Sequence, residues 1–315
     1  MPTRSRRILS ACAVLSMLAL SACGASADSS GDDADGGRNP DKLVLSAIPT
    51  ENSTSLEQSF QGVIAMLEEE TGKDVTFQQA TSYAAIIEGQ RAKKIDIAVY
   101  GPFSYVLARN SGLDIEPAAA LVHAKGAQPG YRSHGFVAAG SDITSLADAK
   151  SEKVCFVEPN STSGYLYPSA GFIEAGLDPA KDIEPVMAGG HDASVLALTN
   201  GQCAVGFAYD AMVEHQLIDR GEIEKGDVTT IWKSEIIPGS PAAVSSDLDS
   251  GLRKKIVSAL QEKANVDYLG SQGFCEGDDC AVGDQENWGF VQVEDSLYDG
   301  VRKVCATTKD EQCSE

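Results

Sequence analysis

Short apolar runs alternate with helical patterns along most of the chain, and this alternation restricts the fold more than any other feature of the sequence. Leu43–Ile48 and Ile95–Tyr100 have the composition of short buried strands. Between them, apolar residues spaced by three and four predict a helix over Leu56–Thr71, which Gly72 ends. Further strands are expected at Val75–Gln79 and Ala118–His123, and further helices at Tyr83–Lys93 and Phe103–Asn110. This order predicts an α/β domain with a parallel sheet.

The alternation starts again after Gly130. Strands are expected at Gly135–Ala139, Lys153–Val157, Ile183–Ala188, Cys203–Tyr209 and Val228–Lys233, and helices at Asp192–Asn200, Asp210–Asp219 and Leu248–Tyr268. The chain passes from the first unit to the second near Arg132 and returns near Ile237. Two such units predict two hinged lobes with strand ends facing each other across a cleft, which is where open α/β sheets bind their ligands.

The first residues have the pattern of an export signal. Three arginines precede an apolar run from Ile8 to Leu20, which is shorter than the ~20 residues that a membrane-spanning helix needs. Small residues then lead to Cys23, and this ending resembles a bacterial lipobox. We therefore predict cleavage of residues 1–22, lipidation of Cys23 and anchoring at the outer face of the cell membrane. An ordinary secreted protein with a chance cysteine is the alternative.

Residues 23–41 are mostly small, polar and acidic, so they predict a flexible tether rather than part of a core. The formal net charge of the chain is −21, and cleavage of the predicted signal would remove three arginines as well. So acidic a surface argues against nucleic acid or an anionic membrane surface as a partner. It does not argue against an anionic ligand, since local donors and dipoles decide a buried site.

Eight cysteines occur, of which Cys12 and Cys23 belong to the export signal and its cleavage point. The others are Cys155, Cys203, Cys275, Cys280, Cys305 and Cys313. An even number in an exported chain predicts three disulfides, although six cysteines allow 15 pairings. The preferred pairs are Cys155–Cys203, Cys275–Cys280 and Cys305–Cys313, the first joining neighbouring strands and the others closing short loops. A metal site at Cys275 and Cys280 is disfavoured because no histidine follows to complete a ligand set.

Three consecutive hydroxyl residues, Ser161, Thr162 and Ser163, stand between a predicted strand and a predicted helix. The first turn of a helix has unpaired N–H groups, and Gly164 allows a ligand to approach the backbone. These residues can therefore hold an oxyanion, which needs several convergent donors and no cation. The alternative is that Ser161 caps the helix while its neighbours are solvated. Pro168 favours a separate turn before a kinked helix.

Eight short stretches of the sequence together resemble a known protein family. In chain order they are Ile48–Glu51, Tyr83–Gly89, Asp96–Gly101, Pro129–Tyr131, Asn160–Gly164, Gly190–Asp192, Ile231–Ser234 and Ile237–Gly239. They resemble the phosphate-, phosphite- and phosphonate-binding proteins of ABC importers, a group within the type II periplasmic binding proteins. The resemblance implies an α/β, two-lobed fold with mixed, mostly parallel sheets and a hinge between lobes. The first lobe would comprise residues 42–132 plus 238–315, and the second residues 133–237.

Carried onto this sequence, the resemblance implies that Tyr83 and Tyr100 contact the ligand from the first lobe. From the second lobe, the ligand contacts would be Ser161, Thr162, Ser163 and His191. Tyrosine hydroxyls are neutral donors to a P–O group, and a histidine donates an N–H and would bind an anion more tightly when protonated. The remaining histidines are expected to be structural.

Two positions bear on the substrate. In aminoalkylphosphonate binders, the resemblance leads us to expect acidic residues that meet the ligand ammonium, one of them where this chain has Ser240. Asp210 either fills the second acidic place or caps its helix. Without the first carboxylate, an ammonium in a desolvated cleft would lack a full partner. The sequence therefore favours phosphate, phosphite or a small alkylphosphonate.

The predicted function is a lipid-anchored, monomeric substrate-binding protein that delivers a phosphorus oxyanion to an ABC permease and its ATPase, with no cofactor, metal or enzymatic activity. One alternative is a secreted hydrolase that uses Ser161 or Ser163 with His191 and Asp210. The sequence Ser-Thr-Ser-Gly is not a G-x-S-x-G elbow, which argues against it. The other alternative is an extracellular ligand sensor for a membrane kinase.

Overall fold

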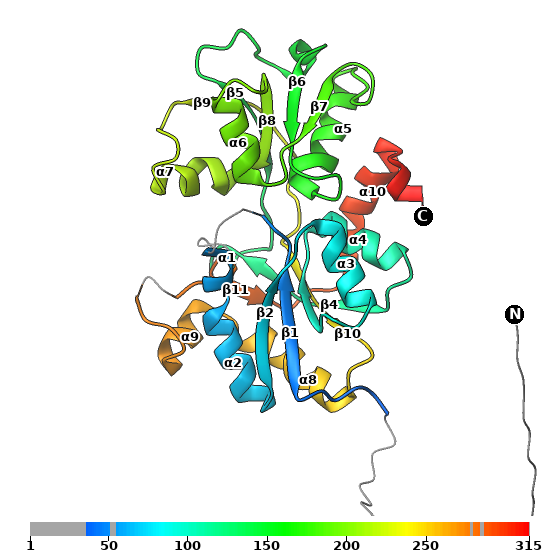
Figure 1. Ribbon diagram of the computed structural model, residues 1–315, viewed down its shortest axis with the longest axis vertical. Coiled ribbons are helices and arrows are strands. Elements are labelled where there is room, and N and C mark those ends of the chain that lie inside the picture. Colours follow the sequence, from blue (N-terminus) through cyan, green and yellow to red (C-terminus); the bar gives the residue numbers. More distant parts are fainter. Residues whose placement is uncertain (1–35, 51–54, 278–279, 284–286, 315) are drawn as a thin grey trace, which may run out of the picture. The chain divides into compact units, whose positions relative to one another are not determined.

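The computed structural model describes residues 36–50, 55–277, 280–283 and 287–314. These residues belong to one compact unit with two β-sheets (Figure 1). The predicted signal peptide and Cys23 lie outside the described residues. None of the helices in the described ranges has the length and apolarity needed to cross a bilayer.

The first sheet has the strand order β11-β4-β10-β3-β1-β2. Its strands are β1 (Lys42–Ala47), β2 (Asp74–Gln79), β3 (Ile97–Val99), β4 (Ile115–Val122), β10 (Pro241–Ser245) and β11 (Gly289–Val291). β1 pairs in parallel with β2 and β3, whereas β10, β4 and β11 add antiparallel strands. The antiparallel part arises because β10 returns from the second sheet and runs back between β3 and β4.

Helices cover both faces of the first sheet. They are α1 (Ser55–Gln58), α2 (Gln61–Thr71), α3 (Tyr83–Arg91), α4 (Pro102–Asn110), α8 (Ser250–Glu262) and α9 (Val266–Gln272). Because side chains alternate along a strand, the first sheet has an apolar cluster on each face. Leu43 and Leu45 belong to the cluster that includes α2 and α8 residues. Ala98 and Tyr100 belong to the cluster that includes α3 and α4 residues. This packing places the ends of β1, β2 and β3 at one edge of the sheet.

The second sheet has the strand order β7-β6-β8-β5-β9. Its strands are β5 (Ser133–Ala138), β6 (Lys153–Phe156), β7 (Glu184–Met187), β8 (Val205–Tyr209) and β9 (Val228–Lys233). The helical segments are η1 (Leu146–Ala149), the π-helical turn η2 (Thr162–Leu166), α5 (Tyr167–Glu174), α6 (His191–Thr199), the π-helical turn η3 (Met212–Gln216) and α7 (Leu217–Asp219). β6 is parallel to β7 and β8, and β5 is antiparallel to β8 and β9. Both sheets are therefore mixed. The expected parallel pairing holds for β1 with β2 and β3, and for β6 with β7 and β8.

Two crossing segments connect the sheets and pair with each other. The backbone N–H of Tyr131 donates to the carbonyl of Ile237 at 2.9 Å, and the reverse bond is 2.8 Å. This short antiparallel bridge lies between β4 and β5 on one segment and between β9 and β10 on the other. The division into two lobes at residues 132/133 and 237/238 stays a prediction, and this pair is the place where we expect a hinge.

The C-terminal segment connects the two halves a third time. It contains η5 (Asp295–Tyr298), α10 (Asp299–Thr308) and η6 (Glu311–Ser314), and α10 lies beside α5 (Figure 1). The hydroxyl of Tyr165, on η2, donates to Asp310 at 3.0 Å. The described chain has the three disulfides expected from the sequence, namely Cys155–Cys203, Cys275–Cys280 and Cys305–Cys313. The last of these closes the loop that carries Asp310.

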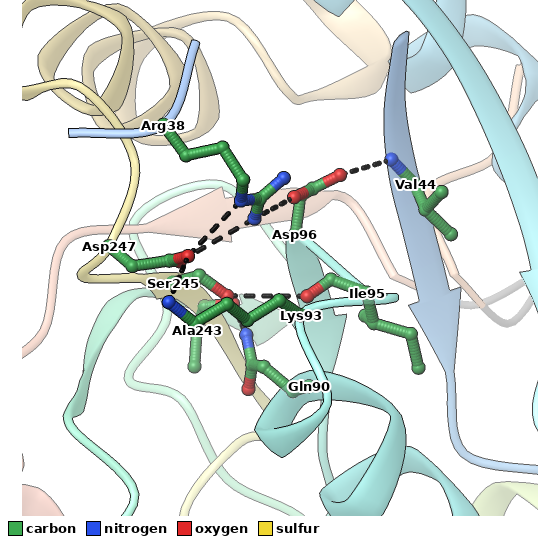
Figure 2. Close-up of polar contacts among 9 residues, drawn as sticks. All are labelled: Arg38, Val44, Gln90, Lys93, Ile95, Asp96, Ala243, Ser245 and Asp247. Carbon is green, nitrogen blue, oxygen red and sulfur yellow. Dashed lines mark hydrogen bonds and ion pairs between the residues drawn. The ribbon is translucent and has the colours of Figure 1, made fainter. Parts of the chain in front are cut away.

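Arg38 fixes the end of the predicted tether to the first sheet (Figure 2). Its guanidinium lies 2.5 Å from a carboxylate oxygen of Asp96 and 3.1 Å from one of Asp247, and its backbone pairs with Leu248. The Asp96 side chain is 3% exposed and also accepts a hydrogen bond from the backbone N–H of Val44 at 2.8 Å. The predicted tether therefore ends earlier than residue 41, because Arg38 is already bound to the first sheet.

The helix predicted over Leu248–Tyr268 is two helices, α8 and α9. The break lies at Asn265, whose side chain accepts a hydrogen bond from the backbone N–H of Tyr268 at 3.0 Å and caps α9. Asn265 also pairs with Gly289 beside β11, so tertiary pairing of the tail fixes an end that the apolar periodicity does not reveal. Within the described ranges, no three His, Cys, Asp or Glu side chains gather closely enough to hold a metal ion.

Candidate functional site

A cavity of about 50 Å³ lies where the ends of the two sheets meet. Five of the predicted contact residues line it: Tyr83, Ser161, Thr162, Ser163 and His191. The first comes from the half with the first sheet, and the other four from the half with the second sheet. The structure thus brings together residues more than 100 positions apart in the sequence.

The three hydroxyl residues follow β6 and lead into η2. Ser161 precedes the turn, and its hydroxyl oxygen accepts a hydrogen bond from the backbone N–H of Gly164 at 3.1 Å. All three side chains are at most 2% exposed, which excludes the alternative of solvated neighbours. A Cβ on Gly164 would lie 2.3 Å from a methyl carbon of Val157, so the tight turn needs glycine here. Ser161 is therefore both a cap and part of the cavity wall.

Thr162 also joins the two halves. Its hydroxyl oxygen accepts a hydrogen bond of 2.8 Å from the backbone N–H of Phe103, in the first turn of α4. Two further bonds connect the halves nearby: the backbone N–H of Tyr83 donates to Glu158 at 3.0 Å, and the backbone N–H of His191 donates to the carbonyl of Thr50 at 3.1 Å. The cavity is consequently surrounded by direct contacts between the halves.

Tyr83 is a neutral donor at the cavity wall. It is the first residue of α3, where the Ser82 side chain caps the helix by accepting from the backbone N–H of Ala85 at 3.0 Å. Tyr83 is 1% exposed, and burial raises the pKa of its hydroxyl far above the usual value, although hydrogen bonding with Ser161 opposes the shift. The hydroxyl oxygen lies 3.4 Å from Nε2 of His191. Both side chains therefore face the same space.

His191 is held in one tautomer. Its Nδ1 lies 3.3 Å from the backbone nitrogen of Tyr209, and a backbone N–H can only donate, so Nδ1 accepts and the proton is on Nε2. Burial lowers the pKa of His191 to about 3. The ring is therefore neutral at physiological pH and offers one N–H donor on the side where Tyr83 lies. This differs from the expectation of a protonated, more tightly binding histidine.

Tyr100 and Asp210 do not line the cavity, contrary to the sequence-based expectation. The Tyr100 hydroxyl donates to Gln90 at 2.7 Å inside the apolar cluster that includes α3 and α4 residues. Strand alternation turns the Tyr100 side chain onto this face of the first sheet. The neighbouring Gly101 reaches the cavity instead. Asp210 accepts hydrogen bonds from the backbone N–H groups of Arg132 and Ala211, each 3.1 Å long, and so fixes the chain where β5 begins and β8 ends.

Sequence reasoning missed several residues of the cavity wall: Tyr131, Tyr209, His123 and Asn287, whereas Ser240, singled out for its bearing on the substrate, does line the cavity. Tyr131 lies on the crossing segment, where burial raises the pKa of its hydroxyl far above the usual value and hydrogen bonds with Ser163 and Thr162 oppose the shift. The motif Pro129–Tyr131 was recognised without a role for its tyrosine. Asn287 lacked any signal, since the stretches that carry the family resemblance end at Gly239.

The arrangement excludes the hydrolase alternative. A catalytic triad needs a carboxylate on the second nitrogen of the histidine, but Nδ1 of His191 accepts from a backbone N–H. Asp210 is engaged with two other backbone groups. Among the described lining residues there are hydroxyl, imidazole and amide groups and no Asp, Glu, Lys or Arg side chain. Such a site is equipped to bind and not to react.

The sequence model of a family described as "ABC transporter, phosphonate, periplasmic substrate-binding protein" matches residues 45–280. The chain belongs to this family. It is therefore an extracytoplasmic substrate-binding protein of an ABC transporter and not an enzyme. The matched segment contains every predicted contact residue and ends before Asn287.

Relatives and solved structures agree with this assignment. The chain is 43% identical to the "Phosphate-import protein PhnD" of Mycolicibacterium smegmatis, over 98% of this chain and 97% of the relative. It is 32% identical to the "Phosphonates-binding periplasmic protein" of Escherichia coli, over 72% of this chain and 70% of the relative. A crystal structure of a binding protein component of an ABC phosphonate transporter from Pseudomonas aeruginosa has a TM-score of 0.73 and 28% identity, with 85% of this chain and 86% of that chain covered. The expected type II periplasmic-binding-protein fold is thereby confirmed.

Proposed function

We propose that this protein binds phosphate, phosphite or a short alkylphosphonate in the cavity between its sheets and delivers it to an ABC permease. One observation carries the proposal: donors from both halves converge on a cavity whose described lining contains no Asp, Glu, Lys or Arg side chain. An oxyanion presents lone pairs in several directions, so it fits a shell of neutral donors that are already oriented. The name of the phosphate-import relative from Mycolicibacterium smegmatis supports the same class of ligand.

The donors stay neutral over the physiological pH range. Burial raises the pKa of Tyr83 and of Tyr131, and it lowers that of His191 to about 3. Each hydroxyl or N–H that bonds a charged oxygen contributes roughly 1.5–3 kcal/mol. Six such bonds would contribute roughly 9–18 kcal/mol, above the ~8 kcal/mol of a micromolar Kd before association costs are subtracted. The shell therefore needs no cation to bind an anion tightly.

The size of the cavity supports a compact ligand. A water-sized group needs about 10–15 Å³ of such space, so a cavity of about 50 Å³ holds roughly three to five groups. Phosphorus with four small substituents fits this estimate, whereas an aminoethyl chain adds three non-hydrogen atoms. Ser240 lies on the wall where a carboxylate would be expected for an ammonium. Both features favour a ligand without an amine.

Binding and release would require the halves to separate. The bonds from Phe103 to Thr162 and from Tyr83 to Glu158 cross between the halves and must break before a ligand can leave. We propose that the chain opens at the paired segments of Tyr131 and Ile237, as in other hinged binding proteins. A ligand that bonds to both halves stabilises the closed form, because each half supplies part of the donor shell.

The partners follow from this function. We propose a monomer that docks on the permease of an importer whose ATPase lies on the cytoplasmic side, with membrane attachment through lipidated Cys23. Replacing Cys23 with alanine should release the protein from the membrane fraction. Retention of the Cys23→Ala variant in that fraction would contradict the anchor. A sensor of a membrane kinase would use the same cavity, and loss of phosphorus uptake on deletion of the protein separates transport from sensing.

Calorimetric titration tests the proposal directly. The unlipidated chain that begins after Cys23 is titrated with phosphate, phosphite, methylphosphonate and 2-aminoethylphosphonate at one pH. We expect at least one of the first three to bind with a submicromolar Kd and the aminoethyl compound to bind more weakly. If no ligand binds below millimolar concentration, the oxyanion proposal is wrong. If the aminoethyl compound binds best, the size argument is wrong.

A further inference from the structure

The C-terminal segment, from η5 to η6, is anchored to the half with the first sheet. The carboxylate of Asp295 accepts a hydrogen bond from the hydroxyl of Tyr105, on α4, at 2.7 Å, and both of its oxygens lie 2.8 Å from the guanidinium of Arg302. The hydroxyl of Tyr298, a fully buried residue, donates to the carbonyl of Gly239 at 3.1 Å. The segment is therefore bound to α4 and to the chain that returns into β10.

The other end of the same segment reaches the half with the second sheet. One carboxylate oxygen of Asp310 accepts a hydrogen bond of 3.0 Å from the hydroxyl of Tyr165. The side-chain amide of Gln312 donates to the carbonyl of Pro159 at 3.4 Å. Tyr165 and Asp310 are both half-buried, and neither lines the cavity. The segment thus crosses the boundary between the halves at a point outside the ligand site.

The loop that carries Asp310 is held in shape from within. The disulfide Cys305–Cys313 closes it, and the hydroxyl of Thr308 donates to the carbonyl of Cys305 at 2.8 Å. The backbone N–H of Gln312 donates to the other carboxylate oxygen of Asp310 at 3.0 Å. The carboxylate is therefore oriented before its partner arrives, which reduces the conformational entropy lost when the contact forms.

Tyr165 belongs to the same turn as the hydroxyl residues of the cavity wall. It lies on η2, two residues after Ser163, and its ring packs edge-on against Phe156 of β6 with the ring centroids 5.5 Å apart. Ser161 to Ser163 line the cavity, whereas the hydroxyl of Tyr165 bonds to the C-terminal segment. One turn therefore contacts the cavity through its hydroxyl residues and the segment through its tyrosine.

Separation of the halves would part Tyr165 from Asp310, because the segment that carries Asp310 is anchored to the first half. Resting on the proposed function, we propose that Tyr165 and Asp310 are positioning residues that latch the halves together over a bound ligand. A contact made only in the closed form raises the fraction of closed protein, and with it the apparent affinity for the ligand. The contact also breaks before the ligand leaves, so it slows dissociation.

The rate of ligand dissociation, followed by stopped-flow fluorescence, tests the latch. The probe is whichever of phosphate, phosphite and methylphosphonate the wild type binds most tightly. Tyr165→Phe removes the hydroxyl and keeps the ring that packs on Phe156. We expect dissociation to be about 5- to 20-fold faster, as for loss of one partly exposed hydrogen bond to a carboxylate, with an unchanged association rate. Weaker binding through slower association alone would contradict the latch.

A double-variant comparison shows whether the two residues act as one contact. Asp310→Ala should also speed dissociation. The variant with both changes should dissociate no faster than Asp310→Ala alone, because the second change then has no bond left to remove. Effects that multiply in the double variant would mean that Tyr165 and Asp310 act independently, and the latch would be wrong.

Tyr105→Phe is the matched control. It also removes a hydroxyl that bonds to a carboxylate of the C-terminal segment, but this bond lies on the side of the first half and stays intact when the halves separate. We expect a lower midpoint of thermal unfolding and the wild-type dissociation rate. Faster dissociation in Tyr105→Phe and not in Tyr165→Phe would show that the segment moves with the second half, and it would overturn the latch.

Hydrogen exchange of the unliganded protein separates the latch from the proposed function. The backbone N–H of Phe103 lies in the first turn of α4, where helices leave it without an internal partner, and it bonds to Thr162 across the halves. Its exchange therefore reports opening without any ligand, and it should be faster in Tyr165→Phe.

The outcomes for the latch and for the function differ. If the wild type binds none of the anions, the proposed function fails, and exchange at Phe103 decides the latch, since an unchanged exchange rate overturns it. If a ligand binds and Tyr165→Phe has the wild-type dissociation rate, the latch is wrong and the function stands.

Discussion

The hydroxyl oxygen of Thr162 accepts a hydrogen bond of 2.8 Å from the backbone N–H of Phe103, and the same side chain lines the cavity. Thr162 begins the π-helical turn beside the second sheet, and Phe103 lies in the first turn of α4 beside the first sheet. Because the oxygen accepts this bond, the hydroxyl proton is available to another acceptor. One hydroxyl can therefore hold the halves together and bond a ligand at the same time.

Replacing Thr162 with valine should weaken ligand binding by about 1–3 kcal/mol, which is roughly a 5- to 150-fold rise in Kd. The variant loses the donor and the bond between the halves but keeps the branched shape. Calorimetric titration measures the change. Thr229→Val, at an exposed position of β9, is the matched control and should bind like the wild type. Wild-type affinity in Thr162→Val would leave the threonine with a structural role alone.

Three tyrosines allow the same atom to be removed inside and outside the cavity. Tyr83→Phe and Tyr131→Phe should each raise the Kd, because their hydroxyls lie at the cavity wall. Tyr100→Phe should leave the Kd unchanged and lower the free energy of unfolding by about 1–3 kcal/mol, since the buried Oε1 of Gln90 loses the donor Tyr100 while its Nε2 keeps the bond to Ala243. Calorimetry and urea unfolding measure the two effects. If Tyr100→Phe binds more weakly while Tyr83→Phe and Tyr131→Phe bind like the wild type, the assignment of Tyr83 and Tyr131 to the cavity and of Tyr100 to the core is wrong.

The buried imidazole of His191 should make the fold sensitive to acid. Its pKa is about 3 in the folded protein and about 6.5 in an unfolded chain. Between these values the unfolded chain binds a proton that the folded protein does not, so the free energy of unfolding falls by up to about 1.4 kcal/mol for each unit of decreasing pH. Above about pH 6.5 this contribution to stability is fully present.

Urea unfolding between pH 4 and pH 7 measures the dependence. In His191→Gln the pH dependence due to this ring should vanish. The free energy of unfolding of the variant should therefore change less with pH than that of the wild type. A slope in His191→Gln equal to that of the wild type would show that the ring titrates alike in both states.

Removing the arginine at the start of the fold should cost stability and not affinity. Arg38→Ala leaves the buried carboxylate of Asp96 with the backbone N–H of Val44 as its remaining partner in Figure 2. We expect the free energy of unfolding to fall by about 1–3 kcal/mol, less than for a fully buried pair because Arg38 is 30% exposed. Lys125→Ala breaks an exposed pair with Asp267 and should change stability by less than ~0.5 kcal/mol. Equal unfolding midpoints for the two variants would contradict the role of Arg38.

The local patterns of the sequence predict the elements better than their ends. Strands β1 to β4 and the three disulfides agree with expectation, because short apolar runs and even cysteine numbers report on burial and export directly, whereas β11 was not expected. The long helix over Leu248–Tyr268 was wrong, since the cap at Asn265 depends on pairing with the distant Gly289. Antiparallel strands were underestimated for the same reason: the return of the chain through β10 is a property of the whole fold.

The candidate site was predictable where function and local structure share a motif. Ser161 to Ser163 occupy a turn whose glycine and cap are visible in the sequence, and the cavity confirms that these side chains gather with Tyr83. Tyr100 failed because a strand end does not reveal which face its side chain takes. Asn287 could not be found, since β11 must first pair with β4 before the residue reaches the cavity.

The position of Arg38 also determines how the protein carries a mechanical load. Arg38 and Asp96 precede β1 and β3, whereas Ile48 and Gly101 follow these strands and reach the cavity, so the attachment and the cavity lie at opposite ends of the same strands. A pull that arrives through Gly36 is transmitted to Asp96 and Asp247 and is borne by the first sheet. The second sheet lies outside this line of force, so the hinge proposed at Tyr131 and Ile237 would let it move while the first sheet stays under tension.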